Sequence, residues 1–225
     1  MSNLITRTVH GLTIRSGDNK PDSIGTLDGY AAVFNSWTKL WEGKSVLFEE
    51  RIAPGAFRDS LNRGDDIRAL FNHDSGSLLG RRSANTLELA EDEKGLRVAI
   101  HLPDTQVGRD TLASVKRGDL TGMSFGFYIR KQSETREQAT EQGKKDTIRT
   151  TIEVADLFEV SAVTFPAYPQ TELAARSLTP DQIKAFEEAD KPENKGISAR
   201  TRWLIARWQM ATGEVGKSGN MQVGS

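Results

Sequence analysis

Apolar and polar residues alternate through most of the first 165 positions, and this alternation predicts strands. The segments with this pattern are 4–15, 25–35, 46–52, 67–71, 87–90, 96–102, 123–130 and 147–165. Two helices are predicted between them. One opens at Pro54 and ends at Gly64, and the other has Asp104 as its N-cap and Gly118 just beyond its end.

The segments 131–146 and 177–225 lack this pattern. Residues 131–146 have Ala139 as their single apolar residue, so they predict a mobile loop between two paired strands. Beyond Leu178 we expect a helix at 179–191, a linker, a two-Trp amphipathic helix at 201–211 and a Gly/Ser-rich, disordered end. The chain is therefore predicted to form one α+β domain at 1–176 and a flexible C-terminal tail at 177–225.

Composition narrows the classes of protein. The 225 residues are 36% hydrophobic with 9 Phe and 4 Trp, enough for a core. A net charge of −1 gives no reason to expect nucleic-acid binding, and no stretch approaches the ~18 apolar residues of a membrane helix. The absence of Cys excludes disulfides, thiol nucleophiles and thiolate metal sites. We expect a soluble protein without a signal peptide.

Ser124 is a candidate nucleophile. It lies between Gly122 and Gly126, which matches the G-x-S-x-G pattern. However, an alternating aromatic segment follows it instead of a helix, and all the histidines precede it, so the α/β-hydrolase order is excluded: they are His10, His73 and His101. The two glycines would leave room for a substrate, or they would simply flank a serine in a β-bulge that carries no chemistry.

A serine hydroxyl needs a base, and histidine is the usual one. His101 lies opposite the apolar face of its predicted strand, which favours a solvated position, and nothing marks His10 as a site. His73 ends a short apolar strand before a small, polar loop, where catalytic groups are commonly presented. His73 is therefore the preferred base.

Glu159 is the candidate that orients this base. It is the one charge in the apolar run 157–165, where a carboxylate is costly unless it is hydrogen-bonded. The alternatives are that Glu159 faces solvent or meets an arginine, and that Glu153 or Asp156 has the orienting role. Asp74 ranks lower, because it would point away from the site.

Five segments in this order resemble the tailed-phage prohead maturation proteases, whose fold and site are similar to those of the herpesvirus maturation protease. They are GYAAVFN (29–35), FEERIAPGAF (48–57), LFNHD (70–74), GMSFGF (122–127) and DLFEVSAVTFPAYPQT (156–171). By position, the resemblance makes His73 the base and Ser124 the nucleophile. The herpesvirus enzymes have a second histidine where the phage family has an acidic residue, here Glu159.

The resemblance implies a closed, mostly antiparallel β-barrel of about seven strands surrounded by helices. It also implies a serine endopeptidase, with no cofactor or metal, that acts inside the prohead in the host cytoplasm. Its expected partners are the scaffolding portion of the major capsid protein and the enzyme itself, with a homo-oligomer as a further possibility and no nucleic acid or membrane. The alternatives are a non-catalytic assembly or scaffolding factor and an unrelated serine esterase.

Overall fold

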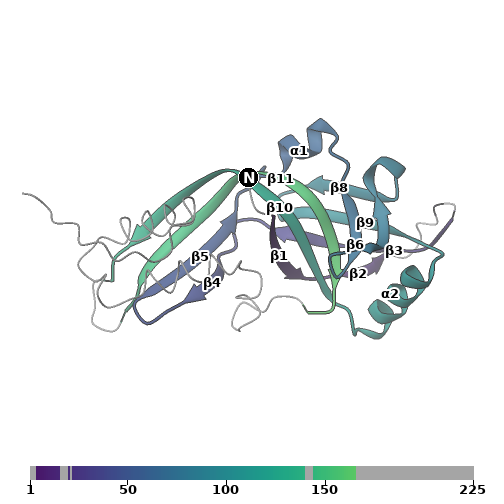
Figure 1. Cartoon of the computed structure of the whole chain (residues 1–225), viewed down its shortest axis with the longest axis horizontal. Coiled ribbons are helices and arrows are strands. Elements are labelled where there is room, and N and C mark those ends of the chain that lie inside the picture. The colour runs from purple at the N-terminus through teal and green to yellow at the C-terminus, as the bar shows by residue number, and fades with distance from the viewer. Residues whose placement is uncertain (1–3, 16–19, 21, 140–143, 166–225) are drawn as a thin grey trace, which may run out of the picture.

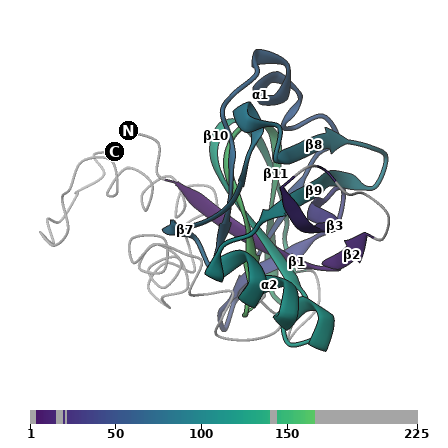
Figure 2. The ribbon, with the colours of Figure 1, turned by 90° about the vertical axis from the view of Figure 1, so that its right-hand side faces the viewer.

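Two β-sheets make up most of the part of the chain that the computed structural model describes, which is residues 4–15, 20, 22–139 and 144–165. The first sheet has the strand order β1-β10-β11-β5-β4, with β6 paired to β11 and β7 paired to β6. The second has the order β2-β3-β9-β8. It lies beside the first half of β10 and the last half of β11 (Figures 1 and 2). Strand pairs are antiparallel except where β11 meets β5 and β6.

The elements follow the predicted segments in most places, with several additions. The strands are β1 (Ile5–His10), β2 (Thr13–Arg15), β3 (Ser23–Val33), β4 (Thr38–Glu42), β5 (Val46–Ile52), β6 (Arg68–Phe71), β7 (Asp74–Arg81), β8 (Leu87–Glu91), β9 (Gly95–Pro103), β10 (Gly122–Glu137) and β11 (Asp146–Val163). The helices are α1 (Arg58–Arg63), α2 (Gln106–Arg117) and the short 3-10 helix η1 (Arg82–Ala84). Within these described ranges no helix is long and apolar enough to cross a membrane.

The expected fold, an α+β closed barrel surrounded by helices, is wrong. The described chain is mostly strand, and the two sheet paths end at β1 and β4 and at β2 and β8, so neither sheet closes. The first sheet stays open because β11 changes its partner along its length. It pairs with β5 over residues 146–152 and with β6 over residues 159–162. The segment that contains α1 connects β5 to β6 in the chain. It is also hydrogen-bonded to β11, because Ala155 N–H donates to the carbonyl of Ala56.

The prediction of a loop at 131–146 is wrong for residues 131–137. β10 continues to Glu137, and this part of it pairs with residues 147–154 of β11, which begins at Asp146. Ladder hydrogen bonds form between main-chain groups, so a polar segment can form a strand when a partner lies alongside. β11 also pairs with β5, and a small separate core of Val46, Phe48 and Ile148 supports this arm, which extends to one side in Figure 1.

The predicted helix ends are correct at the C-terminal side, whereas α1 begins at Arg58, four residues after the predicted start at Pro54. Gly64 and Gly118 both adopt the left-handed conformation that ends a helix, as predicted. The predicted N-cap of α2 is off by one position, because Thr105 and not Asp104 accepts the hydrogen bond from Gly108 N–H. The first predicted strand is interrupted at Gly11, whose φ of 120° favours glycine and separates β1 from β2.

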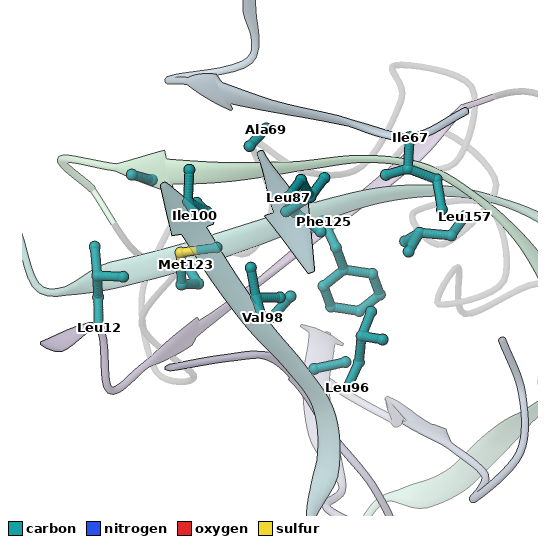
Figure 3. Close-up of a cluster of buried hydrophobic side chains, with 14 of the residues drawn as sticks. Leu12, Ile67, Ala69, Leu87, Leu96, Val98, Ile100, Met123, Phe125 and Leu157 are labelled. Atoms are coloured by element: carbon teal, nitrogen blue, oxygen red, sulfur yellow. The ribbon is translucent and has the colours of Figure 1, made fainter. Parts of the chain in front are cut away.

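One apolar core joins the two sheets, and Figure 3 shows a group of its side chains from β6, β8, β9, β10 and β11. Phe125 stacks on Phe127 with ring centroids 5.2 Å apart, and Phe57 packs edge-on against Phe125 at 5.6 Å. Each fully buried side chain of this size contributes roughly 1.5–3 kcal/mol by burial. These contacts fix which face of β10 points into the core.

The predicted tail at 177–225 lies outside the described residues, which end at Phe165. The domain boundary near residue 176 therefore stays a prediction. The two helices expected at 179–191 and 201–211 fall in the same region.

Candidate active site

The candidate nucleophile lies on the face of β10 opposite the core. Met123, Phe125 and Phe127 are buried in the core, so the alternate residues Ser124 and Gly126 point the other way. Across the antiparallel pair with β11, Ser124 lies opposite Ser161 and Gly126 lies opposite Glu159. Opposite residues in such a pair share a face. The face therefore has two serines and one carboxylate side by side.

A β-bulge puts Glu159 on this face. The register between β10 and β11 shifts between Gly126 and Phe127, which leaves Phe158 as the extra residue of β11. Leu157 and Val160 consequently both reach the core although they are three positions apart, and Glu159 points outward between them. Bulges of this kind commonly redirect a side chain beside an active site.

Gly126 leaves room for the Glu159 carboxylate. A Cβ atom at position 126 would lie 2.7 Å from Glu159 Oε1, closer than two such atoms can approach. The sequence suggested that the glycines beside Ser124 leave space for a substrate. At Gly126, the structure shows that the space is filled by the carboxylate of Glu159.

His73 lies at the tip of the hairpin between β6 and β7. Phe71 pairs with Asp74, and the two residues between them, Asn72 and His73, have φ values of 50° and 61°. Positive φ at both central positions defines a type I′ turn, for which Asn-Gly is the favoured sequence. His73 therefore adopts a conformation that costs a non-glycine residue free energy, and such strain concentrates at functional sites.

The hairpin tip is held on β11 by Asn72. Its N–H donates to the carbonyl of Ala162 at 2.9 Å, and its side-chain Oδ1 accepts from Thr164 N–H at 3.0 Å. These bonds place the next residue, His73, above the face that contains Ser161 and Glu159.

The imidazole of His73 is hydrogen-bonded to Glu159. His73 Nδ1 lies 2.8 Å from Glu159 Oε1, and the carboxylate side chain is 4% exposed whereas the imidazole is 35% exposed. A carboxylate only accepts hydrogen bonds, so Nδ1 carries a proton, and in the neutral imidazole the lone pair is then on Nε2. The pair thus has the geometry of a base held in one tautomer by a buried carboxylate.

Ser124 lies on the same face as Glu159, but its hydroxyl is bonded to β1. Ser124 Oγ donates to the main-chain carbonyl of Arg7 at 2.8 Å, and it has no exposed surface. His73 N–H donates to Ser161 Oγ at 3.3 Å, and Ser161 lies directly opposite Ser124. The main chain of His73 and Ser124 therefore both lie next to Ser161. Because a hydroxyl has one proton, the bond to Arg7 must break before Ser124 can donate to His73.

The rival acids are bonded to other partners. Glu153 forms an ion pair with Lys131, and Asp156 forms ion pairs with Arg63 and Arg130. Hydrogen bonding by Lys131 and then Ser133 lowers the pKa of Glu153.

Asp74, the neighbour of His73, is also occupied, since its carboxylate accepts from Ser77 Oγ and Gly76 N–H. These two hydrogen bonds lower the pKa of Asp74, that of Ser77 most. Of the four candidate acids, the structure brings Glu159 to His73.

His101 does not have the predicted solvated position. It is 2% exposed, with Nδ1 2.9 Å from Thr26 Oγ1 and Nε2 2.9 Å from Glu88 Oε1. This set combines a carboxylate, an imidazole and a hydroxyl, but the His101 side chain is 1% exposed whereas that of His73 is 35% exposed, so this imidazole cannot reach a substrate. In this conformation, the role of His101 is to satisfy buried polar groups.

Sequence reasoning missed Ser161. Two residues after Glu159 in a strand, it shares the face of the carboxylate, and this spacing is the signal that could have found it. Among the described residues, no cluster of three or more His, Asp or Glu side chains is placed to hold a metal ion.

Comparison with known proteins gives one family. A family model described as caudovirus prohead serine protease matches residues 11–186. Among solved structures, the bacteriophage T4 capsid assembly protease matches with 12% sequence identity and a TM-score of 0.45, over 72% of this chain and 98% of that one. No curated protein matches the sequence.

Proposed function

The chain belongs to the caudovirus prohead serine proteases, and we propose that its catalytic residues are Ser124 as nucleophile, His73 as base and Glu159 as the residue that orients the base. The observation that carries this proposal is the 2.8 Å hydrogen bond between His73 Nδ1 and the buried Glu159 carboxylate, on the face where Ser124 lies. The likeness to the herpesvirus protease stays a prediction.

The reaction is a two-step acyl transfer. His73 Nε2 takes the proton from Ser124 Oγ as that oxygen attacks the peptide carbonyl, and then gives it to the leaving amine. Water repeats the sequence on the acyl-enzyme and releases the second product. Glu159 keeps the proton on Nδ1 and stabilises the imidazolium that forms between the two transfers.

Attack requires a local rearrangement. Ser124 rotates about its Cα–Cβ bond so that its hydroxyl leaves the Arg7 carbonyl and turns toward Nε2. The arrangement described here is therefore a resting one, in which β1 holds the proton of the nucleophile. Substrate also needs access to an oxygen that has no exposed surface in this conformation.

We propose that the substrates are the scaffolding portion of the major capsid protein and the enzyme itself, cleaved inside the prohead in the host cytoplasm. Membership of the prohead protease family supports a capsid substrate. Homo-oligomer formation stays a prediction, which the mass of the protein in solution checks.

The test is the Ser124→Ala variant, co-expressed with the major capsid protein and analysed by intact mass spectrometry. We expect loss of capsid-protein and self-cleavage products, with both present in wild type. The matched control is Ser133→Ala, an exposed serine further along the same strand, which should process normally. Unchanged processing by Ser124→Ala would refute the assignment of the nucleophile.

A further inference from the structure

Ser161 links the two groups that form the proposed base. Its hydroxyl donates to Glu159 Oε2 at 2.5 Å and accepts from His73 N–H at 3.3 Å. Glu159 Oε1 in turn accepts from His73 Nδ1. The three residues therefore form a closed ring of hydrogen bonds, with both carboxylate oxygens and the main chain of the base fixed.

The ring accounts for polar groups that would otherwise be costly. Glu159 is 3% exposed and Ser161 is fully buried, so neither can rely on bulk water. An unsatisfied buried carboxylate oxygen is strongly unfavourable. The bond to His73 N–H also supports a residue in the left-handed conformation, which requires compensation from its surroundings.

We propose that Ser161 is a positioning residue of the peptidase, which fixes the Glu159 carboxylate and the main chain of His73 so that Nε2 points toward Ser124. The inference rests on the proposed roles of these three residues. Ser161 acts through its neighbours. It donates its single proton to Glu159, and its oxygen accepts a hydrogen bond from the main-chain N–H of His73.

The electrostatic consequence has a definite sign. A hydrogen bond from Ser161 draws negative charge away from Glu159. Without it, the carboxylate favours the protonated imidazole more strongly. In the pH–activity profile of a Ser161→Ala variant, the acidic limb should therefore move to higher pH. A variant whose fold is merely loosened would lose activity at every pH without a shift of this limb.

The chain provides a closely matched control in Ser60. This residue is also fully buried, donates to a carboxylate, Asp65 Oδ2 at 2.6 Å, and accepts from a main-chain N–H of β11, that of Leu157 at 3.1 Å. Ser60→Ala removes the same set of bonds away from the proposed site. The comparison with Ser161→Ala thus separates positioning from general stability.

The experiment measures the rate at which a tagged fluorophosphonate labels the enzyme from pH 5 to 9, a reaction in which the serine oxygen bonds to phosphorus and fluoride leaves. It also measures the pH response of the NMR signals of the His73 ring. For Ser161→Ala we expect a rate about 10- to 100-fold below wild type, the range of a lost hydrogen bond to a charged group. Both the acidic limb and the ring response should move to higher pH. Ser161→Thr, which keeps the hydroxyl, should recover most of the rate, and Ser60→Ala should leave both profiles in place.

The proposal is overturned if Ser161→Ala matches Ser60→Ala in both profiles, or if mass spectrometry finds the label on Ser161. Continued labelling of Ser124→Ala by the fluorophosphonate would instead refute the assignment of Ser124 as nucleophile. In that case the NMR response of His73 still decides whether Ser161 controls the base.

Discussion

His73 lies in a conformation that glycine adopts at a lower cost than other residues. Replacing His73 by glycine or by alanine should therefore reverse the usual order of stability of these two substitutions. Both substitutions delete the imidazole and its bond to Glu159, and that loss cancels in the comparison. What remains is the main chain, which has a φ of 61° at position 73. A left-handed residue with a Cβ costs about 1–2 kcal/mol. Glycine has the disadvantage of a more flexible unfolded chain, by about 0.4–1 kcal/mol.

The difference predicts that His73→Gly is about 1 kcal/mol more stable than His73→Ala. For a domain of this size, that corresponds to a rise of about 2–4 °C in Tm. Urea unfolding followed by tryptophan fluorescence measures the difference directly, and both variants should lack peptidase activity.

The control is the same pair of substitutions at Leu78, an exposed residue of β7 in the same hairpin. There alanine should be the more stable by about 0.5–1 kcal/mol, the ordinary order in a strand. If His73→Ala is as stable as His73→Gly, the turn is not constrained as described, and the argument that the base is held in a strained conformation is wrong.

Two further predictions concern Gly126 and Glu91. Gly126→Ala should displace the Glu159 carboxylate, because the new Cβ would lie 2.7 Å from Oε1. We expect about 1–3 kcal/mol of destabilisation in thermal unfolding and at least about tenfold slower labelling by the fluorophosphonate. Gly25→Ala, whose new Cβ would meet only the flexible side chain of Leu112, should keep its labelling rate. Burial raises the pKa of Glu91, against a smaller opposite effect of the Phe57 N–H. The folded pKa of Glu91 thus lies above the unfolded one, so its contribution to stability is present below the unfolded pKa and is lost as pH rises through the folded pKa. Glu91→Gln should therefore raise stability near pH 7 and not near pH 4, and equal effects at the two values would contradict this.

The sequence was sufficient for features that depend on local pattern. Alternation located most strands, and Gly64 and Gly118 marked the helix ends because few other residues tolerate the left-handed conformation there. Local pattern also made His73, Ser124 and Glu159 candidates, and the resemblance to the prohead proteases then assigned their roles. Each stood out because its chemistry was unusual for its segment.

Contacts between distant segments were beyond the reach of pattern. β4, β7 and the polar half of β10 form because partner strands lie alongside, and hydrogen bonds between main chains leave no mark on side-chain sequence. The same holds for the openness of the sheets, which follows from the change of partner along β11.

At the site, the sequence by itself determined which side chains are present, and the tertiary structure decided what they contact. The bulge at Phe158 turns Glu159 outward, the hairpin brings His73 above it from 86 positions away, and Ser161 closes the ring between them. The Ser124 hydroxyl points to Arg7 for a similar reason, since β1 pairs with β10 across 117 positions. These contacts depend on distances in space, and no local sequence signal encodes them.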